Sequence, residues 1–161
     1  MDLIKDWKII KKHISESFKT NLHVSIASVS NKGNPSVRPI GTLFLNDNQT
    51  GFYFEKFSSG LFSQNAKGNN KVCVLAVNSS KTFWVKSLFN GSFKKHPALK
   101  VYGELGQKRK ATKTELYALK RRMRNTKSLK GHKYLWGEMD FVRELTFTDV
   151  EVMKLGKMIS A

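Results

Sequence analysis

The sequence predicts a mainly β protein, in which antiparallel strands form a small closed or nearly closed barrel with flanking helices. Two observations indicate this fold class. Apolar or alternating segments of strand length recur between Gly, Asn and Ser turn signals along most of the chain. Short helical segments are inserted between them, which is typical of a β-barrel with peripheral helices. A chain of 161 residues suits one domain with a substantial core, so we expect a single domain over 1–161.

Residues 1–20 predict an amphipathic helix. One stripe carries the apolar side chains, and lysines occupy most of the remaining surface; the stripe consists of Leu3, Trp7, Ile10, Ile14 and Phe18. We expect this helix to pack against the sheet. The alternative is a helix that lies on a membrane surface. The barrel is then expected over residues 21–155.

A hairpin is predicted at residues 23–41, with strands at 23–29 and 36–41 around a Gly-containing turn. Arg38 stands out because the following Pro39 restricts it to extended geometry and cannot donate to a strand ladder. We therefore expect Arg38 at a strand end or edge. A guanidinium held stiffly there suits a phosphate or another planar anion, and an ordinary surface arginine is the alternative.

Four further strands complete the predicted barrel, at residues 51–55, 71–78, 99–106 and 140–147 with 151–155. Residues 58–60 indicate a helix start, and the short helix is expected to end at 68–70. Residues 81–93, which are rich in aromatic residues, are expected to form a connection that contains one helical turn. Residues 131–137 are interpreted as a loop over a cleft.

The formal charge of +17 is unevenly distributed. Residues 108–133 contain eleven Lys or Arg and one acid, Glu115, and a helix with a strongly basic exterior is predicted at 114–125. Such a face could lie along nucleic acid phosphates or an acidic membrane. A solvated helix is the simpler interpretation, because neither a zinc-finger spacing nor an aromatic RNA-binding strand accompanies it.

Several classes of protein are disfavoured by the composition. No apolar run approaches the ~18 residues of a membrane-spanning helix, and early acids argue against a signal peptide, so we expect a cytoplasmic protein. Cys73 lies in an apolar run and is expected to be a small buried hydrophobe, without a disulfide inside the chain. No metal-ligand spacing is present, so no metal is expected. The scattered histidines identify no catalytic acid or base.

The order of these segments resembles the pyridoxamine 5′-phosphate oxidase-like, FMN-binding split-barrel family over roughly residues 21–155. No single segment is diagnostic, and their order and spacing together carry the resemblance. Two of the segments are short motifs: Val-Arg-Pro-Ile-Gly at residues 37–41, and Phe-Tyr-Phe at 52–54, which leads into Ser-Ser-Gly at 58–60. The others are residues 65–74, residues 83–86 together with Gly91 and Phe93, residues 97–104 and residues 109–112.

The resemblance implies a six-stranded, Greek-key antiparallel split barrel and a homodimer with two FMN molecules in clefts between the subunits. It places Arg38, Pro39, Ile40 and Gly41 along the flavin ring and the phosphate side of the cleft. It places Ser58, Ser59 and Gly60 at the phosphate, where exposed N–H groups and hydroxyls at a helix start also form an anion site on physical grounds. The remaining residues that we expect at the cofactor are Asn65, Trp136 and Arg143.

Trp136 would stack on the isoalloxazine, with a core tryptophan as the alternative. Arg143 would correspond to the downstream arginine of the vitamin B6 oxidases. Many family members have a lysine shortly after the phosphate-loop serine, where this chain has Leu61 and Phe62. The phosphate charge must therefore be met by Arg38, by Lys56 or by a basic residue elsewhere.

Together these features predict an FMN-binding flavoprotein that acts as an oxidoreductase on an unidentified small molecule. In such a protein the flavin carries the redox chemistry, and the chain supplies binding, orientation and charge near the ring. The alternative is a non-catalytic split-barrel binding protein whose basic helix docks on nucleic acid or another polyanion.

Overall fold

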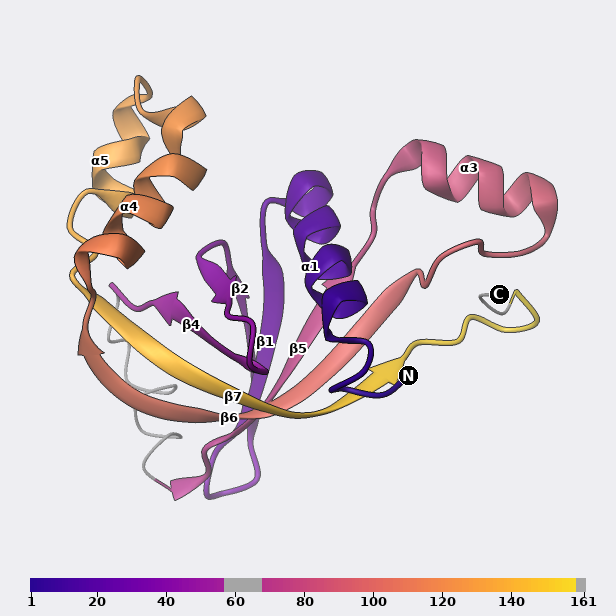
Figure 1. The fold of residues 1–161 in the computed structure, drawn as a ribbon, viewed down its shortest axis with the longest axis horizontal. Coiled ribbons are helices and arrows are strands. Elements are labelled where there is room, and N and C mark those ends of the chain that lie inside the picture. The colour runs from indigo at the N-terminus through magenta and orange to yellow at the C-terminus, as the bar shows by residue number, and fades with distance from the viewer. Residues whose placement is uncertain (57–67, 159–161) are drawn as a thin grey trace.

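The structure, a computed structural model, describes residues 1–56 and 68–158. One antiparallel sheet with the strand order β2-β1-β5-β6-β7-β4-β3 curls into a half-barrel (Figure 1). The fold is therefore mainly β, as predicted. Its strands are β1 (Val24–Val29), β2 (Pro35–Ile40), β3 (Leu43–Leu45), β4 (Thr50–Phe54), β5 (Lys71–Val77), β6 (Ala98–Lys110) and β7 (Phe141–Val152).

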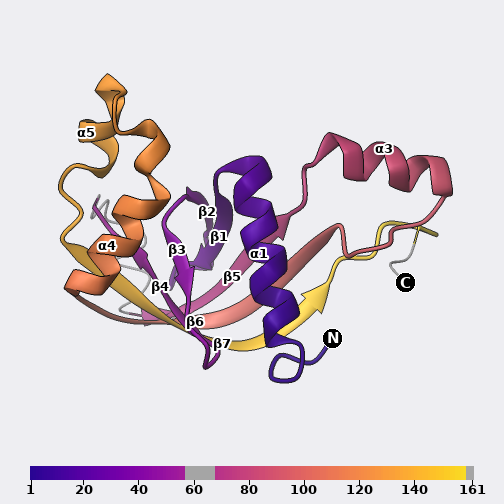
Figure 2. The ribbon, with the colours of Figure 1, turned by 45° about the horizontal axis from the view of Figure 1, so that its top comes forward.

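Helix α1 (Trp7–Asn21) lies in the hollow of the half-barrel (Figures 1 and 2). Its apolar stripe faces the sheet as predicted: Trp7, Ile10 and Ile14 are buried, and Leu3 and Phe18 pack against the same core. The stripe meets alternate residues of the strands, such as Ile26 and Val74, because successive side chains of a strand point to opposite faces. Burial of this stripe fixes α1 on the sheet.

A second, smaller core lies at one end of the sheet. There α4 (Lys113–Arg122), the short 3-10 helix η1 (Arg124–Thr126) and α5 (Lys130–Trp136) stand together (Figure 1). The core is made of Phe52, Phe54, Leu119, Met139 and Val142. Since Tyr53 belongs to the main core, strand β4 is buried on both faces. This double burial positions the residues of β4 firmly.

The strand count differs from the prediction, because the described residues form seven strands and not six. The additional strand is β3, which is only three residues long and is separated from β2 by two residues. Its side chains pair with β4, with Phe44 opposite Phe52. A segment this short has too few positions to show an alternating pattern.

Three local predictions were also wrong. Residues 81–93 contain the ten-residue helix α3 (Lys81–Asn90) and not a connection with a single helical turn. Ser80 caps the start of this helix, because its hydroxyl accepts a hydrogen bond from Phe83 N–H. Gly91, with a φ of 63°, ends the helix. Residues 131–137 belong mostly to α5 and not to a loop. Cys73 is half-buried, because it points to the outer face of β5, away from the main core.

No helix within residues 1–56 and 68–158 is long and apolar enough to cross a bilayer.

Candidate functional site

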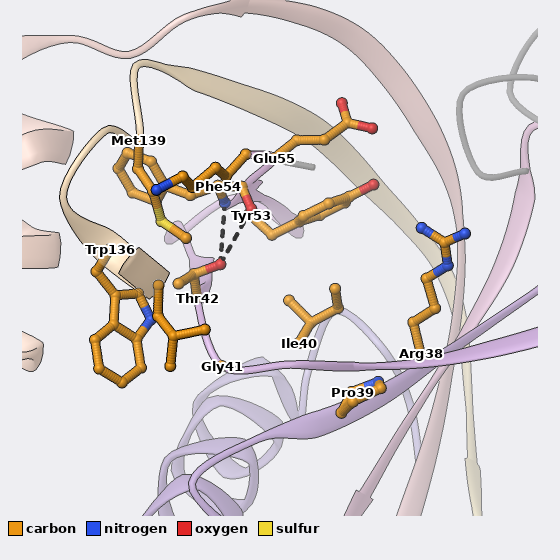
Figure 3. A pocket seen from close by; sticks show the side chains of 12 residues that line it. Arg38, Pro39, Ile40, Gly41, Thr42, Tyr53, Phe54, Glu55, Trp136 and Met139 are labelled. Atoms are coloured by element: carbon orange, nitrogen blue, oxygen red, sulfur yellow. Dashed lines mark hydrogen bonds between the residues drawn. The ribbon is translucent and has the colours of Figure 1, made fainter. Parts of the chain in front are cut away.

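A cavity of about 630 Å³ lies where the two edges of the curled sheet approach each other. Strand β2 forms one wall, the end of β4 forms the opposite wall, and α5 closes one side (Figure 3). Its volume falls in the range of small-molecule sites. The lining residues are Arg38, Pro39, Ile40, Gly41, Thr42, Tyr53, Phe54, Glu55, Lys56, Leu135, Trp136 and Met139.

Arg38 and Tyr53 form the polar end of the cavity. Arg38 is opposite the fully buried Ile26 in the β1–β2 ladder, and directly opposed residues share a face, so Arg38 points into the half-barrel. Figure 3 shows its guanidinium directed toward the Tyr53 hydroxyl. Burial, reinforced by the negative charge of Glu55, raises the pKa of Tyr53 well above its usual value. Tyr53 is therefore a neutral phenol that can donate a hydrogen bond.

A buried ion pair supports this polar end from behind. Arg143 donates from Nε and Nη2 to Glu55 Oε2 at 3.2 and 3.1 Å, and from Nη1 to the Gly106 carbonyl at 3.3 Å. Lys108 Nζ lies 3.8 Å from the same carboxylate oxygen. Only 6% of the Glu55 side chain and 10% of the Arg143 side chain are exposed. The pair thus fixes the end of β4 against β6 and β7.

Ile40, Leu135, Trp136 and Met139 make the opposite end of the cavity apolar. Trp136 closes this end from the last residue of α5, and its ring centroid is 5.4 Å from that of His132. Lys56 Nζ donates to the Tyr134 carbonyl at 2.8 Å, which ties α5 to the chain just beyond β4. The cavity therefore joins one charged, hydrogen-bonding end to one apolar end.

Thr42 connects the two walls at the floor of the cavity. Its hydroxyl accepts from Phe54 N–H at 3.2 Å and donates to the Phe54 carbonyl at 3.3 Å, as the dashed lines in Figure 3 show. Gly41 precedes it, and a Cβ at this glycine would lie 3.2 Å from the Leu22 carbonyl oxygen. The short connection from β2 to β3 is thus packed closely on both sides.

No family model matches the sequence, and no curated protein matches it. Solved structures match the fold. An FMN-binding protein from Syntrophomonas wolfei subsp. wolfei superposes with a TM-score of 0.59 at 14% identity, over 94% of each chain. A protein from Lactobacillus delbrueckii, provisionally assigned as a pyridoxamine 5′-phosphate oxidase, gives 0.52 at 22% identity, over 88% of this chain and 92% of its own. The chain has the split-barrel fold.

A third split barrel of this kind is an F420 reductase, with a TM-score of 0.52 at 14% identity over 84% of this chain and 94% of its own. The resemblance seen in the order of the sequence segments is thereby confirmed for the fold. At identities of 14–22% these comparisons concern the path of the backbone alone.

The split barrel brings together five of the residues predicted at the cofactor. Arg38, Pro39, Ile40 and Gly41 follow one wall of the cavity, and Trp136 faces them from α5. Arg143 lies behind the cavity and pairs with Glu55. The predictions for Ser58, Ser59, Gly60 and Asn65 fall outside the described residues.

Sequence reasoning missed Tyr53 on β4 and Glu55 directly after this strand. Tyr53 and Glu55 are two positions apart, and this spacing places them on the same face of a strand. Both carry polar groups in a segment that is otherwise apolar, and this was the available signal. Thr42, Leu135 and Met139 gave no comparable signal, because their place depends on how β3 and α5 meet the barrel.

Proposed function

We propose that this split-barrel protein binds FMN in the cavity between β2 and β4 and is an oxidoreductase that acts on a small molecule. One observation carries the proposal: the cavity has Arg38 and Tyr53 at one end and an apolar surface with Trp136 at the other. A similarly folded protein from Syntrophomonas wolfei is described as FMN-binding. The residues of the cavity decide whether such a ligand fits here.

Their polarity matches that of the isoalloxazine ring. That ring is planar, with carbonyl oxygens along one edge and methyl groups along the other. The Arg38 guanidinium and the neutral Tyr53 phenol can donate to carbonyl oxygens, while Ile40, Trp136 and Met139 can cover the methylated edge. A ring held between these ends would have one orientation.

The chain's own groups would set the electrostatics around the ring. When bound, the flavin supplies transfer of a hydride or of single electrons. The positive charge of Arg38 favours negative charge at the polar end, and Tyr53 keeps its proton and remains a donor. Trp136, Leu135 and Met139 give the opposite end an apolar lining. By the family resemblance, Ser58, Ser59 and Gly60 would hold the phosphate.

We further propose a homodimer with the cofactor between the two subunits. The outer surface of the described chain leaves large apolar side chains uncovered, which is unusual for a small protein that functions alone. Phe89 is 91% exposed, and Val85 and Leu88 on the same helix are 65% and 64% exposed. On the sheet, Val37 next to Arg38 is 64% exposed. A second copy that covers Val37 would lie against β2, the strand that forms one wall of the cavity.

An FMN titration followed by quenching of flavin fluorescence tests the assignment of the cavity. Arg38→Met should weaken FMN binding about 10- to 150-fold, because a hydrogen bond from a charged donor is worth ~1.5–3 kcal/mol. Arg121→Met removes the same charge from the exposed surface of α4 and should leave FMN affinity unchanged. Equal affinity of the wild type and Arg38→Met would show that FMN does not contact this residue.

A further inference from the structure

A second cavity, also of about 630 Å³, adjoins the first. Gly41 and Trp136 line both cavities and so form part of the wall between them. The second cavity opens between α1, β3 and the segment that follows α4. Most of its surface is apolar and includes Phe18, Phe44 and Met123.

The charged side chains that line this second cavity are all cationic. They are Lys11, Lys19 and Arg122, and no Asp or Glu lines it among the described residues. Lys11 is paired with Asp47, which is fully exposed on the surface. The cavity therefore offers a positive potential next to an apolar surface.

Arg122 is held in a defined position between two aromatic rings. Its guanidinium carbon is 3.6 Å from the centroid of Phe44 and 4.7 Å from that of Phe18. Nη1 donates to the Leu43 carbonyl at 2.6 Å and to the Gly41 carbonyl at 3.4 Å. These contacts orient the planar group and occupy only one of its three nitrogens.

No carboxylate pairs with Arg122 within the described parts of the chain, whereas Arg109 pairs with Glu115 and Glu144, and Arg143 pairs with Glu55. The residue as a whole stays open to solvent, but the two rings cover part of its guanidinium. This desolvation, together with the charge of Arg121, lowers the pKa of Arg122 to about 10. A partly desolvated cation without a counter-ion gains more than a solvated one when an anion binds.

We propose that the second cavity binds a small organic anion, a carboxylate or phosphate on an apolar body. The anionic group accepts hydrogen bonds from the nitrogens of Arg122 that have no carbonyl partner, in the planar geometry that a guanidinium offers to oxygen pairs. The apolar body lies against Phe18, Phe44 and Met123. The proposal stands on residues separate from those proposed to bind FMN and does not require FMN binding.

Calorimetric titration of the intact protein with three probes of equal chain length tests this proposal. Decanoate and decyl phosphate carry the anionic group, and decanol lacks it. At least one anion should bind tenfold or more tightly than decanol at pH 7.5. Arg122→Met should reduce that affinity at least tenfold and leave decanol binding unchanged. Arg38→Met, which alters the first cavity, should leave anion binding unchanged.

A second variant separates binding from folding. Ser15 is exposed on α1 and lines the second cavity, so Ser15→Trp narrows the cavity without removing a contact of Arg122. It should weaken all three probes while circular dichroism and the melting temperature stay close to those of the wild type. Equal binding of decanol and the anions, no binding of either anion, or full anion affinity in Ser15→Trp or in folded Arg122→Met would overturn the proposal.

Discussion

Arg143 and Glu55 illustrate how a single buried pair shapes the candidate site. Arg143→Met would leave Glu55 in its buried position with Lys108, at 3.8 Å, as its remaining ion-pair partner among the described residues. Breaking a buried pair from one side costs roughly 3–5 kcal/mol, so we expect a loss of about 3 kcal/mol in the free energy of unfolding by urea. The double variant Glu55→Gln with Arg143→Met should recover part of this loss. Lys100→Met, which breaks an exposed pair with Glu151, should cost below ~1 kcal/mol.

A stability change within ~0.5 kcal/mol for Arg143→Met would contradict its role as the support of β4. Arg143 would then be available for the cofactor contact that the family resemblance implies. The same urea titrations therefore also decide between the two roles of this arginine.

His13 predicts a pH dependence of stability. It is 7% exposed, its Nε2 lies 3.0 Å from the Ala76 carbonyl oxygen, and burial lowers its pKa from the usual 6.5. The unfolded chain therefore takes up a proton on His13 before the folded chain does. The contribution of neutral His13 to the free energy of unfolding is therefore complete above pH 7. It is lost as the pH drops through 6.5 toward the lowered pKa that His13 has in the folded chain.

His13→Gln keeps a side-chain donor but removes this titration. Between pH 7.5 and 5.5 the wild type should lose about 1 kcal/mol more unfolding free energy than the variant, within the limit of ~1.4 kcal/mol per pH unit for one proton. Parallel pH profiles for wild type and His13→Gln would show that His13 titrates normally in the folded protein.

Among the elements, α4 is held by defined contacts at its start. The Thr112 hydroxyl accepts from Glu115 N–H, and the Glu115 carboxylate accepts from Thr112 N–H, which forms a capping box. Thr112→Ala should lower stability by about 1 kcal/mol in thermal or urea unfolding. Thr114→Ala, inside the first turn, should change it by less than half as much. Equal effects of the two substitutions would exclude a capping role for Thr112.

The basic surface of α4 is narrower than the sequence indicates. Arg109 is braced by Glu115 and Glu144, and Arg122 lies between Phe18 and Phe44. Arg109 lies on β6 and Arg122 is turned between two rings, so neither belongs to a continuous basic face on α4. The alternative of a polyanion-binding module thus depends on other residues of this segment, such as Arg121.

Elements with long patterns were predictable from the sequence, and elements defined by caps or by tertiary contact were not. The stripe from Leu3 to Phe18 predicted α1, because five apolar positions at helical spacing leave few alternatives. Helix α3 was missed although Ser80 and Gly91 mark its ends, because its aromatic residues suggested an irregular connection.

In the site, Arg38 was predictable from the neighbouring proline. Tyr53 was not, since it faces the same cavity as Arg38 only when the sheet curls.

For the whole molecule, the central structural expectation is a dimer that covers α3. In Figures 1 and 2 this helix stands apart from α1 and from α4. Light scattering after size-exclusion chromatography should give twice the chain mass of 18.4 kDa. Phe89→Asp should raise the dimer dissociation constant at least tenfold, because it buries a charge in the interface. Tyr117→Asp on α4, at a residue 67% exposed, should remain dimeric. A monomeric wild type would contradict this expectation.

The visible absorption spectrum of the purified protein, recorded before and after incubation with FMN and removal of free ligand, tests the central claim most directly. The account predicts flavin bands in the protein fraction, shifted from those of free FMN by the Arg38 and Trp136 environment, and FMN in the supernatant after heat release. A colourless protein that retains no FMN under these conditions would contradict it.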